Sequence, residues 1–133
     1  MQVILIELTE LAQFRTFTNV FLMTFRTFTT VDNLFDMLVK RFHIKPEKSL
    51  TEHEYMDWKA NLRNPVQRLV LEVFSIWLMN YWLLEEEPHI TQRLKDFLAL
   101  IVSPPYNTTA IMIVHTIDRL VHWAIILSGL SHC

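Results

Sequence analysis

The clearest periodic pattern in the chain is a run of apolar positions that begins just after residue 65. The positions recur at spacings of three and four, which is the repeat of an α-helix with one buried face. They are Val66, Leu69, Val70, Val73, Phe74, Trp77 and Tyr81. Asn64 precedes them as a candidate N-cap, and Pro65 occupies a first turn that needs no backbone amide. We therefore predict a helix that begins at Asn64 and Pro65.

Two further helices are predicted near the N-terminus, over about residues 3 to 14 and 18 to 28. The apolar side of the first one comprises Ile4, Leu8, Leu11 and Ala12. Thr18 or Asn19 is a candidate cap for the second.

The next predicted helix follows Thr29 and Thr30, whose hydroxyls can accept hydrogen bonds from the free amides of its first turn. Its apolar stripe comprises Val31, Leu34, Phe35, Leu38 and Phe42. Asp32 suits the positive N-terminal end of this helix. Asp36 and Lys40 form an acid-before-base pair on the other face.

Residues 43–50 contain Pro46 and are predicted to form a loop. Thr51 and Glu54 then have the spacing of a capping box, which opens another helix that ends near Asn64.

Two more breaks divide the remainder, one at residues 85–88 and one at Pro104-Pro105. The helix between them is outlined by Ile90, Leu94, Phe97, Leu98 and Ile101. A last helix runs from about residue 109 to 128 and is expected to end at Gly129. The pattern predicts an all-α, single-domain helical bundle of about six helices over residues 1–133.

Composition supports this fold and excludes several classes of protein. Of the 133 residues, 51% are hydrophobic and one is glycine, which excludes disorder and favours helices over hairpins. The formal charge is −2 and the basic residues are scattered, which argues against nucleic-acid binding. Cys133 is the sole cysteine, which fits a reducing, cytoplasmic compartment.

The stretch from Ile111 to Leu130 is apolar enough to raise the question of a membrane span. It carries four polar side chains near its middle, and each is costly in hydrocarbon. These are His115, Asp118, Arg119 and His122. We therefore predict no transmembrane segment, but a soluble helix that is buried on most of its surface.

The same four side chains are the best candidates for chemistry. His115, Asp118 and His122 share one helical face and could bind zinc, which would make the chain a small metal-dependent enzyme. No His-Glu-x-x-His arrangement or cysteine cluster accompanies them. A single glycine also excludes a glycine-rich phosphate loop. We interpret the four as a polar strip and expect no catalytic residue, cofactor or metal.

The last predicted helix has two apolar stripes. The main one suffices to dock it on the bundle and comprises Val114, Ile117, Leu120, Val121, Ala124 and Ile125. The second, beside Arg119, comprises Met112, Trp123, Ile126 and Leu130. A helix with two apolar stripes generally has two neighbours. The second stripe therefore either packs on the N-terminal helix or is a protein-interaction surface.

The run Phe-Leu-Met-Thr-Phe-Arg-Thr-Phe-Thr-Thr at residues 21–30 resembles the opening of the Ras exchanger motif, which commonly reads Phe-Leu-x-Thr-Tyr/Phe-Arg-x-Phe-Thr-Thr. This is the N-terminal domain of Ras-family guanine nucleotide exchange factors. The match continues through Leu34, Leu38, Arg41 and Phe42. Further on, the matching positions are Trp58, Pro65, Val70, Leu71, Val73, Trp77, Arg93, Leu94 and Phe97. One departure is Leu69, where the family usually has arginine; Arg68 lies one place earlier.

The resemblance covers about residues 4–101 and implies a domain without chemistry of its own. In that family the domain packs against the catalytic exchange domain of the same polypeptide and supports its helical hairpin. In some members it also contributes to an allosteric Ras-binding surface. The resemblance implies a cytoplasmic location, with recruitment to the inner membrane face through the longer parent protein. The alternative is a stand-alone adaptor that self-associates through Trp123, Ile126 and Leu130.

Overall fold

The computed structural model describes residues 2–80 and 88–131, apart from the side chains of residues 2–12, 80, 128, 130 and 131. Its elements are α1 (Gln2–Thr24), the 3-10 turn η1 (Phe25–Thr27), α2 (Val31–Phe42), α3 (Glu52–Trp58), the π-helical turn η2 (Lys59–Arg63), α4 (Asn64–Asn80), α6 (His89–Ala99) and α7 (Asn107–Ser131). No strand occurs in the described ranges, so the prediction of an all-α fold is confirmed. The break expected at residues 85–87 lies outside the described residues.

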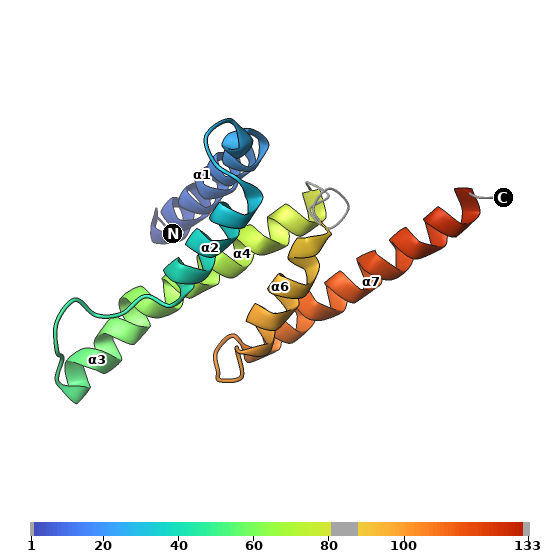
Figure 1. Cartoon of the computed structure of the whole chain (residues 1–133). Coiled ribbons are helices and arrows are strands. Elements are labelled where there is room, and N and C mark those ends of the chain that lie inside the picture. The colour runs from blue at the N-terminus through green and yellow to red at the C-terminus, as the bar shows by residue number, and fades with distance from the viewer. Residues whose placement is uncertain (1, 81–87, 132–133) are drawn as a thin grey trace.

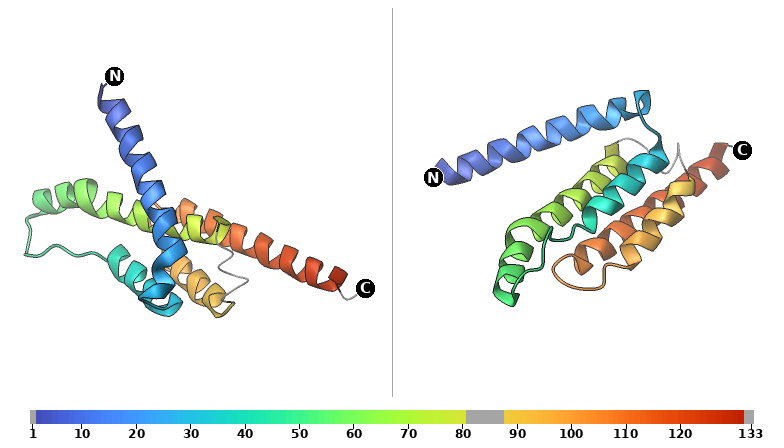
Figure 2. Two further views of the ribbon diagram at one scale, coloured as in Figure 1. Left: turned by 90° about the horizontal axis from the view of Figure 1, so that it is seen from above. Right: turned by 60° about the vertical axis from the view of Figure 1, so that its left-hand side comes forward.

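The helices pack in pairs: α2 lies along α4, and α6 lies along α7 (Figure 1). The C-terminal end of α1 crosses α4, while its N-terminal half extends away from the other helices (Figure 2). The C-terminal half of α7 likewise extends past the end of α6 (Figure 1).

The core lies where α2, α4 and α6 meet the ends of α1 and α7, and it is rich in aromatic rings. Phe74 of α4 contacts Phe35 of α2 and Phe97 of α6, with ring centroids 5.5 and 5.7 Å apart. Trp77 meets the edge of Phe25 at 5.4 Å. Such pairs add about 0.5–1.5 kcal/mol to the energy of area burial. These contacts fasten α2, α6 and the end of α1 to α4.

Two predicted helix starts are confirmed in detail. The Thr30 hydroxyl accepts a hydrogen bond from the Asn33 amide, and α2 begins at Val31 and ends at Phe42 as the pattern predicts. The Thr51 hydroxyl accepts from the Glu54 amide, and the Glu54 carboxylate accepts from the Thr51 amide. The capping box therefore starts α3 at Glu52.

The predicted break between residues 14 and 18 is wrong, because α1 runs without interruption from Gln2 to Thr24. No glycine or proline lies in this segment. The candidate caps serve other roles: Thr18 is buried, and the Asn19 side chain donates to the Arg15 carbonyl within the helix. A lone polar residue therefore did not end the helix.

The predicted helix end at Asn64 is also wrong, because α3, η2 and α4 form one continuous rod. Pro65 lacks an amide hydrogen, and in a regular α-helix its ring would clash with the carbonyl four residues earlier. The chain resolves this with the π-helical turn just before it, in which the Asn64 amide donates to the Lys59 carbonyl, five residues back. Asn64 is therefore helical and not a cap.

The last helix differs most from expectation. It was predicted to be buried on most of its surface, yet only 17% of its most apolar stretch, within residues 107–127, is buried. Ala110, Ile113 and Ile117 are buried, whereas Ala124 and Ile125 of the predicted docking stripe are exposed. At 1.5 Å per residue α7 is about 37 Å long and α6 about 16 Å, so α6 cannot cover it. The helix also continues through Gly129 to Ser131.

Candidate functional site

The predicted second stripe of α7 lies in solvent. Met112, Arg119, Trp123 and Ile126 are exposed, and the Trp123 side chain is 59% accessible. The Leu130 side chain lies outside the described part of the chain. Their helical positions lie roughly opposite the buried face of Ala110, Ile113 and Ile117, because successive residues turn by about 100°.

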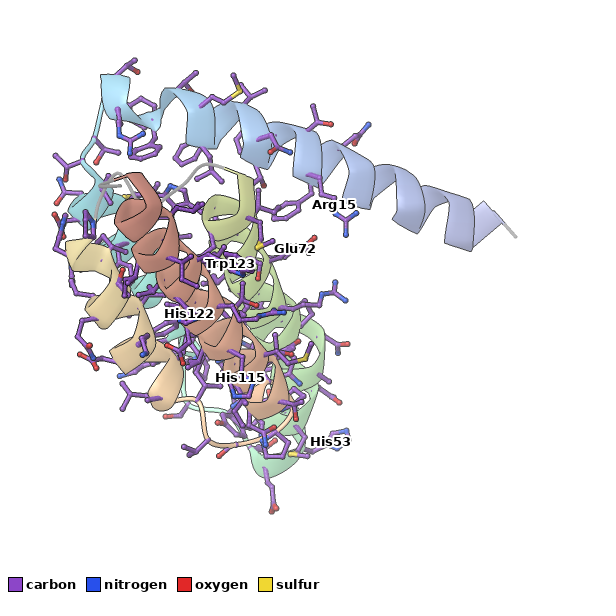
Figure 3. All side chains as sticks on the ribbon, turned by 90° about the vertical axis from the view of Figure 1, so that its right-hand side faces the viewer. Arg15, His53, Glu72, His115, His122 and Trp123 are labelled. Atoms are coloured by element: carbon purple, nitrogen blue, oxygen red, sulfur yellow. The ribbon has the colours of Figure 1, made fainter. Side chains whose placement is uncertain are left out.

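The N-terminal helix does not cover this stripe. It packs on α4 instead, where the Arg15 guanidinium donates to the Glu72 carboxylate at 3.1 Å. Figure 3 shows these two residues on α1 and α4, with Trp123 on the neighbouring α7. Of the two readings of the stripe, packing on the N-terminal helix is therefore wrong for this single chain.

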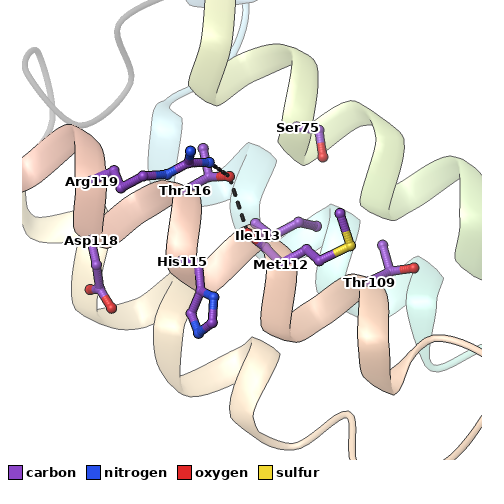
Figure 4. Close-up of a pocket in the computed structure, with 8 residues that line it drawn as sticks. All are labelled: Ser75, Thr109, Met112, Ile113, His115, Thr116, Asp118 and Arg119. Atoms are coloured by element: carbon purple, nitrogen blue, oxygen red, sulfur yellow. Dashed lines mark hydrogen bonds between the residues drawn. The ribbon is translucent and has the colours of Figure 1, made fainter.

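An open groove of about 820 Å³ lies between α4 and α7 (Figure 4). It is lined by Ser75, Thr109, Met112, Ile113, His115, Thr116, Asp118 and Arg119. Ser75 belongs to α4 and faces the Met112–Thr116 side of α7 across the groove. The groove contains Met112 and Arg119 of the predicted stripe, and Trp123 and Ile126 continue the stripe along α7 beyond it. The groove is thus lined mainly by polar side chains, whereas the stripe itself is apolar apart from Arg119.

The two charged side chains on this part of α7, Asp118 and Arg119, have different contacts. Asp118 accepts a hydrogen bond from Lys95 of α6 at 2.8 Å, so its charge is paired. Arg119 donates to the Thr116 hydroxyl at 3.3 Å, and that hydroxyl donates to the Met112 carbonyl at 3.1 Å. Among the described carboxylates none pairs with Arg119. The guanidinium therefore remains available to an acidic partner.

The residues weighed as a zinc site do not form one in the described part of the chain. No three His, Cys, Asp or Glu side chains there are placed to hold a metal ion. Within the candidate set, Asp118 is turned to Lys95.

A second polar cluster joins the N-terminal ends of α2 and α6, and its members come from segments far apart in the sequence. Asp32 accepts from His89 at 2.9 Å and from Arg93 at 3.0 Å. Arg93 also donates to Asp36 and lies over the Phe35 ring, 4.6 Å from its centroid. The expected pair of Asp36 with Lys40 is thus replaced by an interhelical one, because Arg93 is the closer cation in the fold.

Hydrogen bonding in this cluster shifts the pKa values of its members. The bond from His89, with a further one from Arg93, holds the pKa of Asp32 below its ordinary value of 3.8. The Asp36 carboxylate, followed by Asp32, raises the pKa of Arg93. Asp32 and Arg93 are therefore both charged at neutral pH, and their hydrogen bonds join the start of α6 to α2.

The loop before α7 is tied to the start of α4. The Tyr106 hydroxyl donates to the Asn64 carbonyl at 2.6 Å, and burial raises the pKa of this phenol. This bond joins the residue just before α7 to the start of α4.

The residues of the family motif are divided between core and surface. Leu22 and Phe25 are fully buried, whereas Phe28 is exposed and its ring makes an edge contact with that of Phe21, 5.7 Å between centroids. On α4, Arg68 is exposed and Leu69 is partly buried. The buried members of the motif lie in the core where α1, α2, α4 and α6 meet.

Comparison with known proteins adds a family match. The family model described as the RasGEF N-terminal motif matches residues 3–97, so α7 lies beyond the matched part. Among similar proteins, the Ras guanine nucleotide exchange factor efc25 of Schizosaccharomyces pombe is 28% identical over 108 residues, which are 78% of this chain and 11% of that protein.

Two other relatives match shorter segments. The Ras guanine nucleotide exchange factor J of Dictyostelium discoideum is 37% identical over 68 residues, 50% of this chain and 8% of that protein. Cell division control protein 25 of Candida albicans is 32% identical over 66 residues, 50% of this chain and 5% of that protein. The chain therefore spans only a small part of the length of these relatives.

Proposed function

The chain belongs to the RasGEF N-terminal motif family, and we propose that it is the non-catalytic structural and regulatory domain of a Ras-family guanine nucleotide exchange factor. In this role it packs against a catalytic exchange domain and stabilises it. The observation that carries the proposal is the family match over residues 3–97. The names of two relatives as Ras guanine nucleotide exchange factors agree with it.

The exposed stripe of α7 is the proposed contact surface. Met112, Trp123 and Ile126 present large exposed apolar side chains. Arg119 lies among them and would bind a carboxylate of the partner. Leu130 follows in the same helical register. Apolar burial contributes about 25 cal/mol per Å², less the cost of ordering both partners. In this proposal the domain acts by contact alone: by packing against the exchange domain it stabilises one conformation of that domain.

The proposed partners follow from the same family membership. They are the exchange domain of the same polypeptide and, through it or directly, a Ras-family GTPase. The departure at Leu69 removes a charge that the family usually places on α4, and the apolar face of that helix is unchanged. The proposed location is the cytoplasm, with recruitment to the inner membrane face by the parent protein.

Calorimetric titration of this chain into a purified Ras-family exchange domain tests the contact surface. We expect binding that Trp123→Glu weakens by about tenfold or more, because an apolar side chain that the partner would bury becomes a charge. Val102→Glu changes a similarly exposed apolar residue in the loop before α7 and should leave binding unchanged. Equal affinities for both variants would show that the stripe is not the contact.

The exposure of the stripe in a single copy also favours a second candidate, a homo-oligomer or adaptor that pairs through Trp123 and Ile126. Sedimentation equilibrium over a range of concentrations separates the two. A dimer that Trp123→Glu dissociates supports the adaptor, and a monomer at all concentrations rules it out.

A further inference from the structure

Beyond His122, α7 has no polar face in its described side chains. Trp123, Ala124, Ile125, Ile126 and Leu127 follow one another and all are exposed; Ile125 is 67% and Leu127 is 60% accessible. Figure 1 and the left view of Figure 2 show this end of α7 extending past the rest of the molecule. We call residues 123–131 the α7 tip.

The distribution of these side chains around the helix restricts what can cover them. At about 100° per residue, five consecutive positions surround the whole circumference, and Ile125 lies about 200° from Trp123. A partner helix or a groove would cover the side that carries Arg119 and Trp123. It would leave Ile125 in water. A helix that is apolar all round is covered by a core or by lipid.

Length and composition point to lipid. The stretch Asn107–Leu127 has a mean hydropathy of 1.6 and is long and apolar enough to cross a membrane on those two criteria alone. The polar residues His115, Asp118, Arg119 and His122 prevent the whole helix from entering hydrocarbon. The tip alone measures about 13 Å, within the roughly 15 Å of one hydrocarbon leaflet.

Charge next to the tip favours an anionic surface. Asp118 is paired with Lys95, so it offers little repulsion to lipid phosphates. Arg119 has the Thr116 hydroxyl as its hydrogen-bond partner and lies one turn before Trp123. Tryptophan is favoured at the boundary between headgroups and hydrocarbon, and a cation beside it attracts anionic headgroups.

We propose that the α7 tip is a lipid-binding element that dips into the interfacial layer of an anionic bilayer. Trp123, Ile125 and Leu127 enter the outer acyl region, and Arg119 stays among the phosphates. The tip enters the bilayer obliquely, so that its whole circumference is covered, and the polar residues of α7 before it stay in the headgroup layer. The inference rests on the tip and not on the exchange-factor role; because both assign Trp123 and Arg119, a protein partner and a bilayer would compete for these two side chains.

Sedimentation of the full chain with phosphatidylcholine vesicles, with and without phosphatidylserine, tests the proposal. We expect the chain to pellet with the phosphatidylserine vesicles. The double variant Ile125→Asp with Leu127→Asp should bind about tenfold or more weakly, since two charges would enter the acyl region. The control Met79→Asp with Val102→Asp places the same two charges at exposed apolar residues outside the tip and should bind as the wild type does. Circular dichroism verifies that both variants are helical.

Two further readouts keep the outcome unambiguous. An environment-sensitive fluorophore on Cys133, the sole cysteine, should shift to the blue with vesicles. Arg119→Gln should reduce the preference for phosphatidylserine. Failure of the wild type to pellet with either vesicle would overturn the proposal, as would equal binding by the double variant. A lipid-free dimer that the double variant abolishes, without vesicle binding, would assign the tip to a second copy instead.

Discussion

Phe25 and Phe28 belong to one motif but have opposite surroundings, and this difference gives a prediction at the residue scale. Phe25 is fully buried against Trp77, whereas Phe28 is 65% exposed. Phe25→Ala should lower the free energy of unfolding by about 3–5 kcal/mol, because it removes a buried ring and leaves a cavity. Phe28→Ala should cost less than about 1 kcal/mol. Urea unfolding of the two variants measures both, and equal losses would contradict the described core.

Asp32 gives a prediction about pH. Its pKa is lowered in the folded state by His89 and Arg93, so the unfolded chain takes up a proton first as the pH falls. The stabilisation it provides is complete above its ordinary pKa of 3.8 and is lost as the pH falls through the lower folded value. Thermal unfolding from neutral pH to below 3.8 should show that Asp32→Asn is less stable at neutral pH and that the gap closes in acid. A constant gap would exclude the described pairing.

At the scale of the element, the cap of α2 is the clearest test. Thr30→Ala removes the hydroxyl that accepts from Asn33 and should destabilise the chain by about 1 kcal/mol. Thr108→Ala removes an exposed hydroxyl for which no hydrogen bond is described and should be nearly neutral. Chemical unfolding of both variants provides the comparison. A cost for Thr108 as large as that for Thr30 would mean that capping is not the cause.

The elements also show what the sequence could predict. The starts of α2 and α3 were predictable because a capping side chain marks each of them locally. The continuity of α1 and the π turn before Pro65 were not predictable. Thr18 is buried within α1 and does not cap a new helix, and the proline is accommodated by a π-helical hydrogen bond just before it. Local signals fix a helix end only where a side chain binds the free backbone groups.

The candidate site was predictable in part. The stripe of Met112, Arg119, Trp123 and Ile126 follows from helical spacing, but spacing does not tell which of two stripes has a neighbour. The cluster of Asp32, Asp36, His89 and Arg93 joins residues more than fifty positions apart and has no local signal. Arg93 was among the residues that match the family motif. The match did not indicate that Arg93 pairs with Asp32 and Asp36.

At the scale of the whole molecule, α7 carries two sets of residues: one stabilises the fold, and the other is proposed to bind a partner. Ile117 is fully buried, and Ile117→Ala should cost about 2–5 kcal/mol of stability. Trp123→Glu, less than two turns further along, should change stability by less than about 0.5 kcal/mol while it removes binding. Calorimetric melting of both variants tests this separation. A large loss of stability in Trp123→Glu would mean that the stripe is part of the core in solution.

The most direct test of the central claim is the release of fluorescent GDP from a Ras-type GTPase. Three samples are compared: this chain alone, a matching exchange domain alone, and the two mixed. The account predicts that the mixture releases GDP faster than the exchange domain and that this chain alone does not accelerate release. Acceleration by the chain alone, or a mixture no faster than the exchange domain, would contradict the role of a structural partner.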